Sequence, residues 1–401
     1  MMSWIANKIK YGSRSPVLLV YGIYCYVSLL DESLLDLGSF MKLARWGTLL
    51  LLLYALFITL LTEKRSFRTC VLCPLVAVFF SIASIVTKRP YVAVYALFIM
   101  LCAGTEKEDI LRTSLLSVGA AVITIFLMCR IGVITDYIYY GVSDNVQRYA
   151  HCYGFTYYSK MPFILFYCLL TYLCLRRERM MLAEYAGILL LNWYIYRQTT
   201  LRLTYYLTIF VVIAAFMMSR IRNLNLNRKP FRILASIGFP VGLLATYFIM
   251  LLYDNSNALW SSLPGSLHAR IRLNGEGYHT YGIKLLGSYI KMAGNSVLGN
   301  PAKYFYIDSG FAYSLLGYGL VFTVIVVILY TILFRYACFV NDRYLFVCIT
   351  AVLFFTMINN TWVTLNYNPM LLFSLPALEF LQARRWKHGE ETEWLRTGGE
   401  F

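Results

Sequence analysis

Blocks of apolar residues recur along the whole chain, and most are long enough to form a helix that crosses a membrane. Such a helix needs about 17–25 predominantly apolar residues. The blocks are apolar all round and not along one stripe, which is typical of helices surrounded by lipid or protein core. We therefore predict an all-α integral membrane protein of about 12 transmembrane helices, near residues 16–31, 44–62, 69–87, 90–105, 113–131, 161–175, 180–196, 203–219, 232–253, 309–335, 344–358 and 363–381.

The composition agrees with this pattern. Hydrophobic residues make up 59% of the 401 residues, charged residues make up 14%, and the mean hydropathy is +0.61. Soluble domains have roughly 45–50% apolar and about 25% charged residues. Lipid, and not water, is therefore expected to be the main solvent of this chain.

The polar segments between the blocks are mostly short, so we expect one polytopic membrane domain over residues 1–381 and a short cytoplasmic tail over 382–401. Two outer segments, about 132–160 and 254–308, are longer, and long loops are usually functional or disordered. The second is the large loop between spans nine and ten. Its apolar residues Tyr281, Leu285, Leu286, Tyr289 and Ile290 share one helical face, which predicts a short amphipathic helix over the outer mouth of the bundle.

The distribution of positive charge predicts the orientation. If the N-terminus is inside, most of the 36 Lys and Arg residues fall on inner segments, as the positive-inside rule requires. Both termini are then cytoplasmic. The net charge of +16 is explained by this bias and by attraction to the anionic headgroups of membrane lipids. Because the sequence contains no folded basic domain, nucleic acid is not an expected partner.

Polar residues gather in three places on the predicted outer side. Arginine binds phosphate well, because its planar guanidinium donates paired hydrogen bonds and keeps its charge. Several arginines near the bilayer surface therefore suit a lipid phosphate or diphosphate, although they would equally bind phospholipid headgroups or pair with acidic side chains. For His151 and His279 a local partner is favoured over catalysis. The clusters contain Arg148 and His151; Arg197 and Arg202; and His268, Arg270, Arg272, Glu276 and His279, followed by Tyr306 and Asp308.

The sequence gives no reason to expect a metal or a cofactor. The outer side has no HxxxH, HExxH or DxD pattern that would place metal ligands together. The inner side has no glycine-rich phosphate loop followed by lysine, which argues against a nucleotide-driven pump.

The polar clusters resemble motifs of the O-antigen and capsular polysaccharide polymerases of bacteria, the Wzy family, which is related to the O-antigen ligases. The resemblance covers about two-thirds of the chain, and it rests on the order and spacing of motifs that are individually loose. The motifs are "RYAHCYGF" (148–155), "TTLRLTYY" (199–206), "LHARIRL" followed by "YGIKLLG" (267–287), and "YFYIDSGFAYSLLGYG" (304–319).

This resemblance implies a metal-independent membrane glycosyltransferase with a GT-C-like bundle. Its substrate would be an undecaprenyl-diphosphate-linked oligosaccharide, polymerised on the outer face into O-antigen, capsule or exopolysaccharide, with a chain-length regulator as a further partner. Arg148, Arg202 and Arg270 match the family's arginines and would hold the donor diphosphate and stabilise its departing charge. Asp308 matches the family's aspartate and would either orient Arg270, the role we favour, or act as a base. Arg197, Arg272, Tyr306 and His279 are further candidates for binding the diphosphate or the sugar.

Two departures from the family pattern matter. His268 and Ala269 replace a Ser-Gly pair, and His268 is a candidate for the general base because imidazole titrates near neutrality. Asn359 and Asn360 stand where relatives often have glutamate, so the identity of an acid or base in that region stays open. An O-antigen ligase and a non-enzymatic flippase or transporter remain alternatives. A transporter is expected to have helices broken at mid-membrane and two similar halves, which the sequence does not display.

Overall fold

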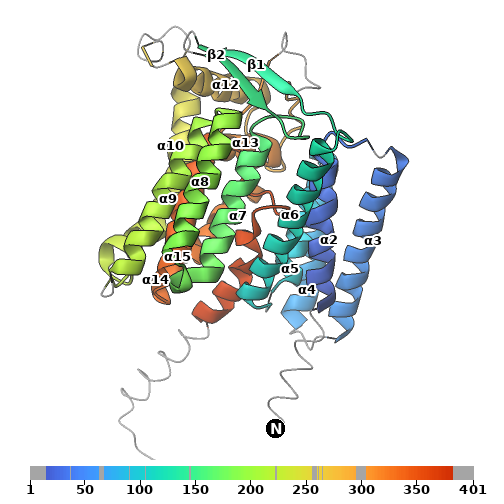
Figure 1. Cartoon of the computed structure of the whole chain (residues 1–401). Helices are drawn as coiled ribbons and strands as arrows, with labels where there is room; N and C mark the ends of the chain where they lie inside the picture. Colours follow the sequence, from blue (N-terminus) through green and yellow to red (C-terminus); the bar gives the residue numbers. More distant parts are fainter. Residues whose placement is uncertain are drawn as a thin grey trace, which may run out of the picture.

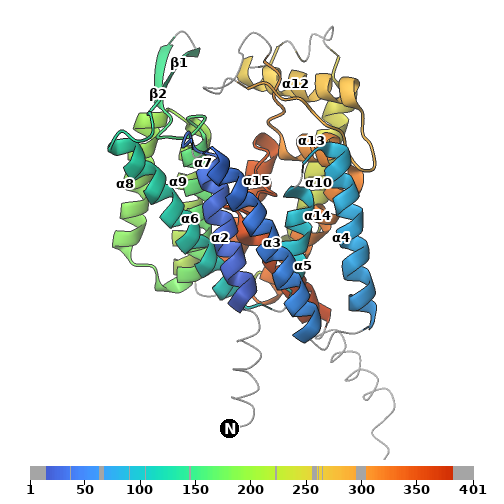
Figure 2. The same ribbon diagram turned by 90° about the vertical axis from the view of Figure 1, so that its right-hand side faces the viewer.

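The computed structural model describes residues 15–36, 38–62, 67–89, 91–103, 105–143, 146–221, 224–254, 260, 262–263, 265–294 and 304–382. The tail expected over 382–401 lies outside these residues except for Gln382. The chain forms a bundle of helices that run up and down between two ends (Figures 1 and 2). The first half contributes α2 (Ser15–Asp31), α3 (Ser39–Thr62), α4 (Phe67–Thr87), α5 (Tyr91–Leu101) and α6 (Lys107–Arg130).

The second half of the bundle follows the same alternation. Its helices are α7 (Lys160–Arg176), the short 3-10 turn η1 (Arg177–Arg179), α8 (Leu182–Thr199), α9 (Arg202–Arg220), α10 (Lys229–Leu252), α14 (Leu320–Phe339) and α15 (Arg343–Ile358). The first and second halves meet where α6 packs on α7. Helix ends carry the expected charges in α6, where Glu108 and Asp109 lie in the first turn and Arg130 in the last, so that each sign complements the helix dipole.

Five of the described helices are long and apolar enough to cross a membrane, and they indicate a multi-pass membrane protein. They are Ser39–Phe57, Lys107–Arg130, Arg202–Arg220, Lys229–Leu252 and Leu320–Phe339. Five further apolar helical stretches span 10–17 described residues, and one of them, Val78–Thr87, is the later part of α4. The prediction of about twelve membrane-length helices is therefore wrong. Two of the predicted blocks, 309–335 and 363–381, are interrupted by other backbone geometry, and several of the other helices are short.

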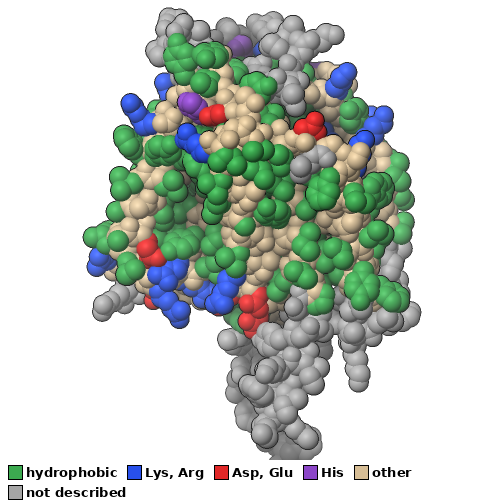
Figure 3. All heavy atoms as spheres, turned by 45° about the vertical axis from the view of Figure 1, so that its right-hand side comes forward, with side chains coloured by type: hydrophobic (Ala, Val, Ile, Leu, Met, Phe, Trp, Pro, Cys, Tyr) green, Lys and Arg blue, Asp and Glu red, His purple; other side chains and the backbone are tan. Residues whose placement is uncertain are grey.

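The surface of the bundle fits this assignment. Figure 3 shows hydrophobic side chains around its middle, whereas charged side chains gather toward the two ends. Large apolar side chains point outward from many helices; Ile85, Leu116 and Leu190 are 77%, 74% and 66% exposed. In water such a surface would be an aggregation hazard, whereas against lipid tails it carries no penalty.

One end of the bundle carries the two longer connections, and we call it the α12 end. The first connection forms an antiparallel hairpin of β1 (Ile138–Ser143) and β2 (Val146–His151), in which Ile138 pairs with His151 and Ser143 with Val146. The second contains α12 (Gly265–Tyr281), which lies across the end of the bundle (Figures 1 and 2). The hairpin is the only sheet in the described part of an otherwise all-α fold.

The amphipathic helix expected from Tyr281 to Ile290 is not where we predicted it. The helix of this loop ends at Tyr281, and residues 282–292 are not helical. Their backbone binds other segments instead: the Ser288 amide donates to the Leu316 carbonyl at 2.9 Å, and the Leu320 amide donates to the Lys284 carbonyl at 3.0 Å. The segment is therefore an extended strap and not an amphipathic helix: Ile290 is buried at 3% exposure, whereas Leu285 and Tyr289 are 66% and 50% exposed.

That strap occupies a break in the helix predicted over 309–335. The chain forms α13 (Gly310–Tyr313), continues as the π-helical turn η3 (Ser314–Tyr318), and restarts as α14 after Gly319. Gly319 has a φ of +95° and Gly287 in the strap a φ of +83°, a region that favours glycine. A Cβ atom on either glycine would overlap the backbone of the other segment. The interruption therefore needs both glycines.

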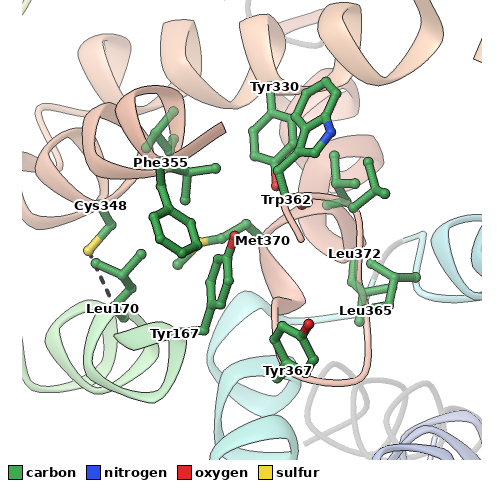
Figure 4. Close-up of a cluster of buried hydrophobic side chains, with 14 of the residues drawn as sticks. Tyr167, Leu170, Tyr330, Cys348, Phe355, Trp362, Leu365, Tyr367, Met370 and Leu372 are labelled. Carbon is green, nitrogen blue, oxygen red and sulfur yellow. Dashed lines mark hydrogen bonds between the residues drawn. The ribbon is translucent and has the colours of Figure 1, made fainter. Parts of the chain in front are cut away.

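A second departure from helix follows α15, where the chain turns back into the bundle before the 3-10 helix η4 (Pro369–Phe373) and a last helical stretch to Gln382. Figure 4 shows this region, with the rings of Tyr330 and Trp362 face to face and the Tyr367 side chain projecting from the loop itself. The Tyr330 and Trp362 ring centroids are 5.4 Å apart, and Phe239 stacks on Tyr330 at 4.7 Å. Residues 359–368, which we call the re-entrant loop, are thus embedded in an aromatic core.

Candidate functional site

A cavity of about 630 Å³ lies toward the α12 end, between α2, α3, α5 and the re-entrant loop. This volume is in the range of pockets that hold small molecules. Its wall combines aromatic, amide and charged side chains, and it also includes Lys160 at the start of α7. The lining residues used below are Asp31, Glu32, Lys42, Arg45, Tyr91, Tyr95, Lys160, Tyr306, Tyr313, Tyr318, Asn360, Asn366 and Tyr367.

Side chains from other segments hold the re-entrant loop through its backbone carbonyls. The Tyr21 hydroxyl donates to the Leu365 carbonyl at 2.8 Å, and the Tyr330 hydroxyl donates to the Trp362 carbonyl at 2.6 Å. The Asn368 side-chain amide donates to the same Trp362 carbonyl. Non-helical backbone at membrane depth is tolerated only where protein buries it or where it lines a cavity. The re-entrant loop meets both conditions, so its geometry is explained by the cavity it forms.

Two ion pairs stand at the cavity wall. The Lys160 ammonium lies 2.7 Å from Oε2 of Glu32, and both side chains are largely buried. The other oxygen of Glu32 accepts a hydrogen bond of 2.9 Å from Nδ2 of Asn366. The neighbouring Asp31 pairs with Arg45 of α3, on the more exposed side of the cavity. The pairs place two carboxylates and two cations around one space, which gives it the polarity needed to bind a polar ligand.

Tyrosine is the most frequent residue of the wall. The rings offer flat apolar faces and the hydroxyls offer hydrogen bonds, a combination suited to a ligand with apolar and polar faces. A sugar ring has this character, since its C–H groups form apolar patches between its hydroxyls. The tyrosines that line the cavity are Tyr24, Tyr91, Tyr95, Tyr306, Tyr313, Tyr318 and Tyr367.

Arg89 lies behind two of these tyrosines. The residue follows α4 in the chain and is 7% exposed. Its guanidinium lies 4.6 Å from the Tyr313 ring centroid and 5.6 Å from the Tyr318 ring centroid. It donates to the Tyr313 hydroxyl and, at 3.4 Å, to the Ile290 carbonyl. The arginine thus connects the π-helical turn to the strap and fixes one wall of the cavity.

The structure brings the predicted Arg270 and Asp308 together. Nε of Arg270 lies 3.4 Å from Oδ2 of Asp308, so the aspartate is placed to orient the arginine. Burial raises the pKa of the Asp308 carboxyl above its ordinary value of 3.8, and the charge of Arg270 opposes this rise. Asp308 also raises the pKa of Tyr306, after the larger effect of burial. Tyr306, two residues before Asp308 in the chain, is a residue of the cavity wall.

No predicted residue of α12, Arg270 included, lines the cavity, and neither does Asp308. Arg272 pairs with Glu276 one turn later on the same helix, at 2.7 Å. His279 is exposed, and its ring lies 5.5 Å from that of Tyr278. His268 is half-buried on the same helix, and neither histidine lines the cavity.

The remaining predicted arginines are on the opposite side of the α12 end. Arg197 lies in the last turn of α8 and Arg202 begins α9; both are exposed and neither lines the cavity. Arg148 pairs through its backbone with Gly141 in the hairpin, and its side chain lies outside the described residues. His151 has the local partner expected of it, because its Nδ1 lies 2.8 Å from Oδ2 of Asp136. The three clusters therefore do not form one site around Arg270.

Sequence reasoning missed several cavity residues. Glu32 and Lys160 belong to segments that carry no motif. Arg89, which supports the wall from behind Tyr313 and Tyr318 without lining the cavity, was one of many loop arginines. One signal was present: "NNTWVTLNYNP" (359–369) places four asparagines among apolar residues. A run of amide side chains inside an apolar block is costly in lipid unless the amides bind partners, so it marks a segment folded into the protein.

Comparison with known proteins does not name the site: no protein-family model, no curated protein and no solved structure matches the chain. Among the residues that the structure describes, no group of three or more His, Cys, Asp or Glu side chains is arranged to hold a metal ion. The chemistry of the site must be argued from the cavity and its charged residues alone.

Proposed function

We propose that the protein is a polysaccharide polymerase of the bacterial cytoplasmic membrane, which joins undecaprenyl-diphosphate-linked oligosaccharide repeat units on the outer face. The observation that carries the proposal is the tyrosine- and asparagine-lined cavity beside the Arg270–Asp308 pair. The cavity offers the surfaces that sugar rings require, and the arginine offers the charge that a diphosphate requires. The type of reaction, glycosyl transfer from a lipid diphosphate, is inferred from the motif resemblance.

In this mechanism the donor diphosphate lies against Arg270, whose guanidinium stabilises the negative charge that grows as the diphosphate leaves. Asp308 holds that guanidinium in place from the other side. The tyrosine rings of the cavity bind the saccharide and limit the access of water, which would otherwise compete with the acceptor hydroxyl. The α12 end then faces outward, and both termini face the cytoplasm.

The decisive experiment uses purified protein and a lipid-diphosphate-linked repeat unit, with product length read on a gel. Wild-type protein should extend the units, and EDTA should leave the rate unchanged. Arg270→Ala should lower the rate about 100- to 1,000-fold, while Arg179→Ala, at the opposite end of the bundle, should not. Normal chain extension by Arg270→Ala would contradict the diphosphate role.

A strain that lacks the protein separates the enzyme alternatives. Single repeat units on the lipid carrier indicate a polymerase, whereas long unattached chains indicate an O-antigen ligase. The helix break at Gly319 is the feature that favours a transporter, since transporters build substrate sites from interrupted helices. Transport without chain extension in reconstituted vesicles would support that alternative. Labelling of cysteines introduced over 270–294 should occur from outside the cell, and labelling only from the cytoplasm would overturn the orientation.

A further inference from the structure

We propose that Glu32 accepts the proton of the attacking sugar hydroxyl, and that the side-chain carbonyl of Asn366 helps to hold that hydroxyl. This assignment rests on the proposed glycosyl transfer and identifies its base. Glu32 directly follows α2, and its carboxylate borders the cavity, where the side chain is 26% exposed. It is therefore both held by the protein and open to a ligand.

The hydrogen bonds of Glu32 leave room for a substrate. A carboxylate accepts about four hydrogen bonds, two on each oxygen. Lys160 occupies a position on Oε2 at 2.7 Å, and Asn366 occupies one on Oε1 at 2.9 Å. A position on each oxygen thus remains for a donor in the cavity. The two bonds also fix the direction of the carboxylate, which a general base needs in order to meet its proton.

Asn366 provides independent evidence for a missing donor. The residue is 2% exposed, and its Oδ1 atom has no hydrogen-bond partner in the described structure, although its Nδ2 binds Glu32. A buried carbonyl oxygen without a donor is unfavourable. A sugar hydroxyl bound beside Glu32 would supply that donor.

The other carboxylates near the cavity are less suited to this step. Asp31 forms its ion pair with Arg45, on the more exposed side. Asp308 pairs with Arg270, and this pair is the proposed diphosphate site. Tyr306 lines the cavity together with Glu32, and it lies two residues before Asp308 in the chain. The proposed donor site therefore adjoins the cavity that contains the proposed acceptor site.

The reaction balances with these groups. The acceptor hydroxyl oxygen forms a bond to the anomeric carbon of the donor sugar. The bond between that carbon and the diphosphate oxygen breaks, and its electron pair leaves with the diphosphate near Arg270. The proton of the hydroxyl passes to the Glu32 carboxylate, which later releases it to water.

The test compares Glu32→Gln with Glu108→Gln, an exposed glutamate of α6 that lies 3.6 Å from Arg177 at the far end of the bundle. Glu32→Gln should lower the transfer rate at least about 100-fold, as loss of a general base does, and should still bind radiolabelled lipid-linked donor. Glu108→Gln should match wild type in both. Asn366→Leu should raise the KM for the acceptor more than it lowers kcat.

A double variant distinguishes a loss of catalysis from a loss of folding. Glu32→Gln leaves the Lys160 charge unpaired, so Glu32→Gln combined with Lys160→Gln removes that cause of instability. If the double variant regains wild-type transfer, or if Glu32→Gln alone stays within about threefold of wild type, the base assignment is wrong while the proposed function stands. A wild-type protein that performs no transfer refutes the proposed function, and this assignment with it.

Discussion

The guanidinium of Arg89 lies 4.6 Å from the centroid of the Tyr313 ring and 5.6 Å from that of Tyr318, which places a buried cation against both ends of the π-helical turn. The arginine comes from the connection between α4 and α5, and the turn lies more than 200 residues later. This contact secures a stretch of backbone that has left regular α-helical geometry.

Replacing Arg89 should therefore loosen the turn. Arg89→Met is expected to destabilise the protein by about 2 kcal/mol, the size of a desolvated cation–π contact, measured as a lower denaturation temperature in detergent. Lys88→Met is the matched control: Lys88 is exposed and lies 5.3 Å from the Tyr289 ring, so its loss should change the temperature little. Equal effects of the two variants would contradict the clamping role of Arg89.

The glycine contact between the strap and the helix break predicts a graded series. Gly287→Ala and Gly319→Ala should each cost more than about 2 kcal/mol, because each new Cβ adds an overlap with backbone to the strain of positive φ. Gly282 has a φ of +63°, but a Cβ atom added there would meet open space. Gly282→Ala should therefore lower the free energy of unfolding by only about 1 kcal/mol. Thermal denaturation of the three variants measures the series, and a Gly282 variant as unstable as the others would remove the packing explanation.

Asp342 predicts a pH dependence of stability. It caps α15 by accepting from the Leu345 amide, and it lies 2.7 Å from the Lys107 ammonium. Burial raises the pKa of this carboxyl, but Lys107, the Leu345 amide and Arg177 outweigh burial and hold the pKa below 3.8. The native state thus binds the proton more weakly than the unfolded state does.

It follows that Asp342 contributes its full stability above the ordinary value of 3.8 and loses it as the pH falls through the lowered pKa. Asp342→Ala should cost about 3 kcal/mol near neutrality, as loss of one partner of a buried ion pair does, and should flatten the acid limb of stability against pH. Denaturation temperatures measured across the acid range provide the test. An unchanged acid limb in the variant would assign that limb to other carboxylates.

Asp308 should behave in the opposite sense. Its pKa is raised by burial, so the native state binds this proton more tightly than the unfolded state does. Its contribution to stability therefore falls as the pH rises from 3.8 through the raised pKa. Protonation also neutralises the partner of Arg270, so transfer activity should decline on acidification, and Asp308→Asn should be less active and lack this decline. A pH profile of Asp308→Asn identical to that of wild type would separate the pair from catalysis.

The sequence was most informative where a segment is apolar over its full length. The span predicted at 344–358 is observed as Arg343–Ile358. The helix is buried among other helices, and its apolar sequence alone is enough to predict it. The span predicted at 113–131 begins earlier, at Lys107, because the polar residues Glu108 and Asp109 are favourable in a first helical turn. A prediction from hydropathy alone places the helix boundary at the first charged residues and so misses this polar first turn.

The broken helix and the strap could not be predicted in this way. Residues 309–335 read as one continuous apolar helix, and only the approach of Gly287 explains why the chain restarts after Gly319. The same holds for the site. Arg270 and Asp308 were found because each belongs to a motif, whereas Glu32 and Asn366 acquire meaning only from a hydrogen bond that spans 334 residues.

This long separation bears on how the protein is made. Tyr21 and Glu32, at the beginning of the chain, bind Leu365 and Asn366 near its end. During synthesis α2 therefore enters the membrane before residues 365 and 366 are made, so the Tyr21 hydroxyl and the Glu32 carboxylate lack their final partners until then. Contacts of such sequence separation form slowly, and unfinished chains expose the surfaces that mature protein covers. Nascent chains that stop before the re-entrant loop would insert into the membrane without forming the cavity, and quality-control proteases could recognise the uncovered face of α2.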